Sequence, residues 1–318
     1  RKATRKCLMI MICQTTIARS TAISGIGLHT GQRINMTLRP ADAGVGIVFH
    51  RQIGDRKVTI EATSANVVDT RLATVIGKGD ARVSTVEHLL AALAAYGVDN
   101  LHIDIDGPEV PIMDGSAAPF VSVLEEAGLT RHSVSRKFLA IRKPVSVIDG
   151  EKRVTIIPSR FFRITFDIAF QHPCIALQQR SVKVTTAGFR KELAPARTFG
   201  FLKDVESLKA AGLARGGSLE NAIVVDDEKI LNPEGLRFHD EFVRHKILDA
   251  IGDLSLIGYP ILGHVRAFKA GHDVNHQLVE KIIDTPDSWQ LLEFSEDDVQ
   301  AALQMTPAFA SDMAFSKV

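Results

Sequence analysis

Residues 240–257 carry a histidine, a lysine and two aspartates on one side of a predicted helix. His245 and Asp249 are one helical turn apart, with Cβ atoms about 5–6 Å from each other, which is close enough for both side chains to hold one metal ion. Lys246 lies beside them. Asp253 lies a further turn along, where it is better placed to orient another group than to act as an equal ligand. The alternative is a solvated helix face with a weak His–Asp pair, which is the commoner case for this spacing alone. The stripe contains short acids rather than Glu or Gln, which favours a cleft.

A second candidate pair, Glu87 and His88, stands at the start of an apolar helix. Residues 84–87 (STVE) match a capping box, in which the glutamate bonds back to the first cap amide, and this is the structural alternative for Glu87. A histidine near a helix N-terminus is disfavoured as a cation, so His88 should be neutral, the form that binds metal. Zinc hydrolases also place a glutamate beside such a histidine to remove a proton from water. The sequence contains no His-Glu-x-x-His, which excludes a protease of that type.

Rival metal clusters have ordinary explanations. His102, Asp104 and Asp106 alternate along one predicted strand, as on the wet face of a half-covered antiparallel sheet. His272 stands at a strand-to-helix turn, where capping explains the neighbouring Asp273 or Asn275 but does not require a histidine. The three scattered cysteines cannot form a cysteine-type zinc site, so any metal must be held by histidine and carboxylate.

Composition limits the class of protein. The chain has 318 residues, 45% apolar residues and a net charge of +1, as in an ordinary globular protein of two domains. There is no dense Lys/Arg stripe, so we expect no nucleic-acid partner. No apolar run approaches the roughly 18 residues of a transmembrane helix. Few cysteines fit a reducing cytoplasm, where we expect the protein to act. Residues 1–10 are interpreted as a non-native or disordered extension.

The predicted elements that position these residues occur in the same order in both halves of the chain: strands, helix, strand, helix. The pattern predicts an α+β fold of two domains with similar topology, each a mostly antiparallel sheet with helices on one face. The domains are expected at 11–133 and 134–300, followed by a tail at 301–318, with the site at their interface. A polar stretch at 131–137 separates the blocks, and 70–80 (TRLATVIGKGD) is expected to be a variable loop. The predicted helices are 84–96, 116–127, 202–211, 240–257 and 273–284, and the predicted strands include 101–106, 137–148, 152–159, 161–170, 222–227 and 261–270.

An ordered set of strings resembles the UDP-3-O-acyl-N-acetylglucosamine deacetylase family of Gram-negative lipid A synthesis. Any one string is weak, but the set is highly specific and runs from about Met11 to past residue 290. The resemblance implies two α+β domains with helices packed between the sheets. The strings are STVEHLLAAL, GVDN, VPIMDGSAAPF, ARTFGF, GGSLENAIVVDD, LNPEGLRFHDEFVRHKILDAIGDL and FKAGHDVN.

The resemblance implies a zinc-dependent hydrolase that removes the N-acetyl group of UDP-3-O-(3-hydroxyacyl)-N-acetylglucosamine. It implies one catalytic Zn²⁺, with Fe²⁺ as the alternative in the cell, and a fourth position open to water. Glu87 then acts as general base in place of a capping role. The metal ligands carried over are His88, His245 and Asp249, and the other catalytic residues are His272 as general acid, Asp253 orienting it, Thr198 at the oxyanion and Lys246 as nearby charge.

The same resemblance implies the substrate contacts and the remaining expectations. We expect a monomer whose partner is the acylated UDP-sugar. Two alternatives remain: a zinc amidohydrolase acting on another N-acyl sugar, and a non-catalytic nucleotide-sugar binding protein. The implied contacts are Phe170 on the uridine, Asp204 near it, His29 and Lys269 at the diphosphate or sugar, and Phe199, Phe201 and Gly217 along an acyl passage.

Overall fold

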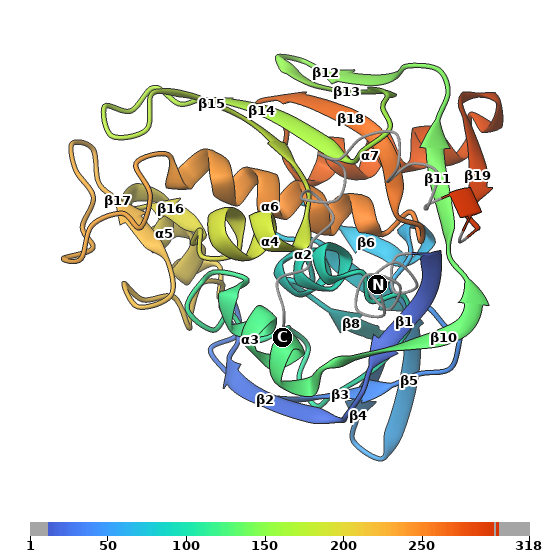
Figure 1. Ribbon diagram of the computed structural model, residues 1–318. Coiled ribbons are helices and arrows are strands. Elements are labelled where there is room, and N and C mark those ends of the chain that lie inside the picture. The colour runs from blue at the N-terminus through green and yellow to red at the C-terminus, as the bar shows by residue number, and fades with distance from the viewer. Residues whose placement is uncertain (1–11, 296, 299–318) are drawn as a thin grey trace.

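The first half of the chain is built around a five-stranded sheet (Figure 1). The strand order is β2-β3-β9-β4-β5, with every pairing antiparallel except β4–β9. The computed structural model describes residues 12–295 and 297–298, so the expectations for 1–10 and 301–318 lie outside the described residues. The elements of this half are β1 (Cys13–Ile17), β2 (Thr21–Ile26), β3 (Arg33–Pro40), β4 (Ile47–Ile53), β5 (Arg56–Glu61), η1 (Ser64–Asn66), β6 (Val67–Asp69), β7 (Val75–Lys78), β8 (Ala81–Val83), α2 (Glu87–Tyr96), β9 (Leu101–Ile105), α3 (Ala118–Ala127) and β10 (Leu129–Ser135).

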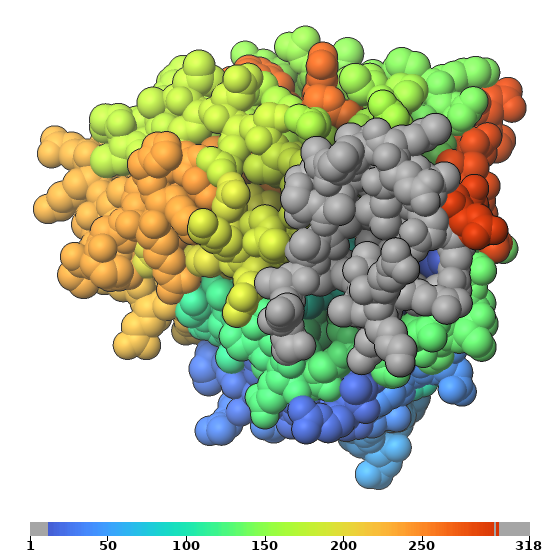
Figure 2. All heavy atoms as spheres, viewed as in Figure 1, coloured from blue at the N-terminus to red at the C-terminus, as the bar shows by residue number. Residues whose placement is uncertain are grey.

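The second half forms a seven-stranded, mostly antiparallel sheet. Its main path is β12-β13-β18-β11-β19, and β14 pairs with both β15 and β18. In the space-filling view of Figure 2, the two halves occupy opposite sides of the molecule. The elements are β11 (Lys137–Ile141), β12 (Val145–Asp149), β13 (Lys152–Pro158), β14 (Arg163–Ala169), β15 (Leu177–Lys183), α4 (Thr186–Gly188), η2 (Phe189–Leu193), β16 (Phe199–Phe201), α5 (Leu202–Ala210), β17 (Ile223–Val225), α6 (Glu241–Ser255), β18 (Ile261–Phe268), α7 (His272–Ile283), η3 (Pro286–Ser288) and β19 (Trp289–Glu293).

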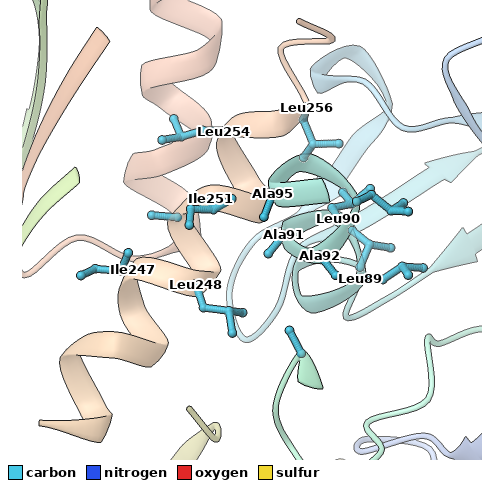
Figure 3. Packing of buried hydrophobic residues seen from close by; sticks show 14 of the residues in the cluster. Leu89, Leu90, Ala91, Ala92, Ala95, Ile247, Leu248, Ile251, Leu254 and Leu256 are labelled. Carbon is cyan, nitrogen blue, oxygen red and sulfur yellow. The ribbon is translucent and has the colours of Figure 1, made fainter. Parts of the chain in front are cut away.

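Helices α2 and α6 lie between the two sheets and pack against each other (Figure 1). Both are buried along nearly their whole length, which fits helices that have no solvated face. Figure 3 shows the small side chains of Ala91 and Ala95 on the side of α2 that faces α6, next to Ile251. Short side chains allow two helix axes to approach closely, so the start of α2 is brought near the polar stripe of α6.

Gly252 permits the closest approach between these helices. A Cβ atom built on this glycine would lie 2.0 Å from the backbone carbonyl oxygen of Glu87, which no side chain could tolerate. The first residue of α2 therefore rests directly on α6. This contact carries Glu87 and His88 to the helix that holds His245 and Asp249.

The α+β class is confirmed, with helices between the sheets, but two local expectations are wrong. Helix α2 begins at Glu87 rather than at residue 84, and the capping box is not formed. The Ser84 amide donates instead to Pro108 (2.9 Å), and Thr85 has a φ of 57° and donates its hydroxyl to Glu109 (3.1 Å). Irregular backbone at Thr85 thus replaces the first turn.

The polar stretch between the two blocks and the segment expected to be a loop both contain strands. Most of the polar stretch 131–137 belongs to β10, which pairs antiparallel with β1 at the other end of the first half. The segment expected to be a loop at 70–80 contains β7 and, just beyond it, β8 begins. β7 has only four residues, and β10 is polar and pairs with a strand more than 100 residues earlier in the chain, so hydrophobic periodicity reveals neither.

Two further features bear on the site. Strands β16 and β17 form a separate parallel pair, and helix α5 between them contributes no buried side chain. Among the described residues, we find no helix with the length and apolar character needed to cross a bilayer.

Candidate active site

A cavity of about 290 Å³ opens between the two halves and collects most of the predicted site residues. Loops and helix ends supply its walls, including the β2–β3 turn, the start of α2, the start of β16 and the polar stripe of α6. The predicted residues that line it are His29, Glu87, His88, Phe170, Thr198, Phe199, His245, Lys246, Asp249 and His272.

At the floor of the cavity, two histidines and one aspartate converge. His88 Nε2 lies 3.5 Å and His245 Nε2 lies 3.3 Å from the same oxygen, Asp249 Oδ1. One potential ligand atom from each side chain falls within 4.8 Å of the others, and all three residues are buried. Asp249 Oδ1 has no hydrogen-bond partner among the described residues. A buried carboxylate oxygen without a partner, facing two imidazole nitrogens, fits a metal-binding site.

Neighbouring groups hold the cluster in the protonation state that a metal needs. His245 Nδ1 lies 3.0 Å from the Ala196 carbonyl, which can only accept, so Nδ1 carries the proton and Nε2 keeps a lone pair. Burial lowers the pKa of His245 to about 4, so the ring is neutral. Burial alone would raise the pKa of Asp249, but the positive charge of Lys246 opposes this, and the pKa lies well below its usual value.

Lys246 is tied to the same carboxylate. Its Nζ lies 2.7 Å from Asp249 Oδ2, the oxygen that faces away from the histidines. Burial lowers the pKa of Lys246, but the charge of Asp249 and their hydrogen bond outweigh this and raise it overall. The lysine is therefore a fixed positive charge on the cavity wall.

Beside the three ligands, Glu87 and His272 face each other across the cavity. His272 Nε2 is 4.0 Å from Glu87 Oε1, and His272 Nδ1 donates to Asp253 Oδ2 at 2.9 Å. Burial lowers the pKa of His272, but the charge and hydrogen bond of Asp253 outweigh this and raise it to about 9. Burial raises the pKa of Glu87, although positive charge on His272 opposes the rise. The pair thus combines a basic carboxylate with a protonated imidazole.

Two residues of this network were not predicted from the sequence. Thr74 donates its amide to Glu87 Oε2 (3.0 Å) and its hydroxyl to Asp253 Oδ1 (2.6 Å). Asn275 donates to Asp253 Oδ2 (2.9 Å). Asn275 lies in the string FKAGHDVN, where its position resembled helix capping, whereas nothing in the sequence distinguishes Thr74.

The opposite wall of the cavity contains Thr198, Phe199 and Phe170. The Thr198 amide donates to the Gly115 carbonyl at 2.8 Å, which fixes the backbone directly before β16. The Phe199 ring packs edge-on against Phe242 and Phe170, with centroid distances of 5.0 and 5.8 Å. This wall is therefore aromatic and close to the metal-binding cluster.

The remaining predicted residues do not line the cavity. Asp253 lies beneath it, in contact with His272, and Phe201 packs behind Phe170 with 5.8 Å between ring centroids. Asp204 is exposed on α5. Gly217 lies in a loop, next to Gly216. The Gly216 amide donates to the carbonyl of Leu28, the residue that precedes His29. Lys269 forms an ion pair with Glu151 at 2.8 Å and directly precedes Ala270, which does line the cavity.

The cavity also has lining residues that the sequence did not single out. Most are small or apolar, so they resemble core residues in sequence. They are Leu28, Leu72, Ala73, Thr85, Ile112 and Ala270.

The rival cluster on β9 has the ordinary explanation. His102 is hydrogen-bonded to His50, and Asp104 forms ion pairs with Arg39 and Lys57. Asp106 accepts from the side chain and amide of Asn35. These groups satisfy one another along the open face of the sheet.

Comparison with known proteins gives a consistent picture. Residues 14–284 match the family model described as UDP-3-O-acyl N-acetylglycosamine deacetylase. A protein of Syntrophotalea carbinolica named UDP-3-O-acyl-N-acetylglucosamine deacetylase is 65% identical over 304 residues, covering 96% of this chain and 98% of the relative. Proteins of the same name from a Geobacter species and from Myxococcus xanthus are 58% and 54% identical, covering 90% and 88% of this chain and 93% and 89% of the relatives. This chain, with its buried cluster of two histidines and one aspartate, therefore belongs to the UDP-3-O-acyl-N-acetylglucosamine deacetylase family of metal-dependent amide hydrolases.

Proposed function

We propose that this protein hydrolyses the acetamide of UDP-3-O-acyl-N-acetylglucosamine, the committed step of lipid A biosynthesis. Water adds to the acetyl carbonyl and the C–N bond breaks, so the products are acetate and the free sugar amine. The observation that carries the proposal is the convergence of a metal-binding cluster, a basic carboxylate and a protonated imidazole on one cavity. Amide hydrolysis needs these three functions together.

The metal proposed for the His88, His245 and Asp249 cluster is a single Zn²⁺. Two neutral imidazoles and one carboxylate are the donor set of catalytic zinc sites that keep a position open for water. When bound, the ion supplies Lewis-acid activation of the attacking water and of the substrate carbonyl. Fe²⁺ accepts the same donors, so metal analysis must decide between the two ions.

Glu87 is proposed as the general base. Its Oε2 is occupied by the Thr74 amide, which leaves Oε1 facing the cavity to accept the proton from the attacking water. Burial raises the pKa of this carboxyl toward the working pH, which improves a general base.

His272 is proposed as the general acid that protonates the departing amine. Its Nδ1 is held by Asp253, so Nε2 is the atom that faces Glu87 and the cavity. With its pKa raised to about 9, the ring carries a proton at neutral pH. Thr198 and Lys246 line the same cavity and are proposed to stabilise the oxyanion.

The substrate is proposed to lie along the aromatic wall. Phe170 and Phe199 line the cavity and support contacts with uridine and acyl chain, respectively, and His29 supports a contact with the diphosphate or sugar. The contacts of Phe201, Asp204, Gly217 and Lys269 stay predictions.

We also propose a cytoplasmic monomer with domains at 11–133 and 134–300, the two halves that form the separate main sheets.

The test is acetate release by the purified protein, with metal content measured on the same sample. Acetate should appear with UDP-3-O-acyl-N-acetylglucosamine and be much slower with UDP-N-acetylglucosamine, which lacks the acyl chain. Equal rates with both substrates would show that the enzyme does not recognise the acyl chain. This result would favour the alternative, an amidohydrolase acting on another N-acyl sugar. A protein that carries metal but releases no acetate from either would contradict the proposed function.

A further inference from the structure

Among the residues that the structure describes, Thr74 is the one that hydrogen-bonds to both the Glu87 carboxyl and the Asp253 carboxyl. Its amide donates to Glu87 Oε2 at 3.0 Å, and its hydroxyl donates to Asp253 Oδ1 at 2.6 Å. Its carbonyl accepts from the amide of Val86 at 3.3 Å, so the threonine also holds the backbone just before α2. The residue is 2% exposed, which shields all these bonds from water.

The geometry sets which oxygen of each carboxyl is available for chemistry. Since Thr74 occupies Glu87 Oε2, the other oxygen, Oε1, faces His272. Asp253 is arranged in the same way: Thr74 takes Oδ1, and Oδ2 is left for His272 Nδ1. Thr74 thus determines which oxygen of Glu87, the proposed base, is free to accept a proton. It also determines which oxygen of Asp253 binds the ring of His272, the proposed acid.

Position in the fold makes Thr74 suited to this coupling. Glu87 belongs to α2 in the first half, whereas Asp253 belongs to α6 in the second half. Thr74 stands in the connection between β6 and β7, directly after the cavity-lining residues Leu72 and Ala73. A displacement of this connection would therefore change both carboxyls at once.

We propose that Thr74 is a positioning residue that couples the general base to the general acid. This rests on the proposed roles of Glu87 and His272. The hydroxyl is the part open to substitution, because the backbone amide remains in any variant except proline. Thr74→Val removes the hydroxyl and keeps the β-branched shape, whereas Thr74→Ser keeps the hydroxyl.

The experiment compares these variants in steady-state deacetylation, with rates normalised to bound metal. Thr74→Val should lower kcat at least about tenfold, part of the 10²–10⁴ that acid–base catalysis contributes, with KM within about twofold of wild type. Thr74→Ser should keep kcat within about threefold of the wild-type value, because serine supplies the same hydroxyl donor. Thr37→Val on β3, away from the cavity lining, is the matched control and should leave kcat unchanged.

A double-mutant cycle separates positioning from general destabilisation. Thr74→Val should have little further effect in an Asp253→Ala background, because that substitution removes the acceptor of the Thr74 hydroxyl. Additive losses would overturn the proposal. It would also be overturned by wild-type kcat in Thr74→Val, or by a loss of kcat that only mirrors a loss of metal or folded protein.

A second readout does not depend on turnover. In imidazole ¹⁵N NMR of the metal-loaded protein, His272 should give one sharp signal set in wild type and Thr74→Ser, and broadened or doubled signals in Thr74→Val. Identical His272 signals in all three proteins would overturn the coupling. If wild type released no acetate, the proposed function would fail, while this comparison would still decide whether Thr74 orients the pair.

Discussion

The backbone of Gly252 lies directly against the backbone of Glu87, with room for no more than a hydrogen at the Cα of the glycine. A Cβ atom there would be 2.0 Å from the Glu87 carbonyl oxygen. Gly252→Ala should therefore push α2 away from α6, separate His88 from Asp249 and weaken metal binding. Overpacking of this kind costs about 1–3 kcal/mol of unfolding free energy. Urea unfolding and metal titration would measure both effects.

The control for this substitution is Gly200→Ala. No atom lies within 4 Å of a Cβ built on Gly200, so this variant should retain wild-type metal affinity. Equal metal affinity in Gly252→Ala would show that the helices can separate without disturbing the ligands, contrary to the expectation.

Removal of the proposed base should abolish turnover without removing the metal. Glu87→Gln keeps an oxygen that can accept from the Thr74 amide but cannot take a proton from water. We expect kcat to fall by about 10²–10⁴-fold, the usual contribution of general base catalysis. Acetate release and metal analysis on one sample provide the measurement, with the exposed Glu126→Gln on α3 as control. Retention of more than a tenth of the activity would assign the base to another group.

Loss of a ligand should remove the metal itself. His245→Ala and Asp249→Ala each leave only two of the three donors, so elemental analysis should find them largely metal-free after dialysis. The exposed His239, whose side chain is 89% accessible, gives the matched control His239→Ala. Full metal content in either ligand variant would show that the assignment is wrong.

Metal removal should also lower stability. Asp249 Oδ1 is a buried oxygen without a hydrogen-bond partner among the described residues, so binding an ion there should stabilise the folded state by an amount that grows with the logarithm of the metal concentration. The Tm should fall after chelation and rise again with added Zn²⁺. A Tm that does not respond to either treatment would place the metal elsewhere or make it incidental.

Activity should decline at high pH as His272 loses its proton. The charge of Asp253 outweighs burial and raises the pKa of His272 to about 9, so the kcat profile should fall above about pH 9. Because the folded-state pKa is raised, the stabilisation from this pair is fully present below the unfolded value of about 6.5 and is lost as pH rises through about 9. Asp253→Asn should move the alkaline limb of the profile to lower pH. An unmoved limb would mean that another group controls it.

The local part of the site could be predicted from the sequence, because helical spacing alone places His245, Lys246 and Asp249 on one face. His88 joins them only through the packing of α2 on α6. This packing depends on a glycine contact that no periodicity indicates. The assignment of His272 came from family resemblance, since its position at a turn had an ordinary explanation.

Errors arose where distant contacts override local preference. Residues 84–87 match the capping-box pattern, but the Thr85 hydroxyl donates to Glu109 instead, and the helix begins only at Glu87. Thr74 and Asp253 are 179 positions apart, so their hydrogen bond has no local trace in the sequence. The same holds for β10, whose partner β1 stands at the opposite end of its half.

Helix α5 contributes no buried side chain, so the unit formed by β16, α5 and β17 is anchored by its strands, where Ile223 and Val225 of β17 are buried in the core. Substitutions on the exposed helix α5 should therefore disturb the core little. Phe199 on β16 lines the cavity, whereas the proposed base and metal ligands belong to α2 and α6. The proposed acyl contact and the proposed chemical groups are therefore carried by separate elements, so a substitution in β16 can alter the first without replacing the second.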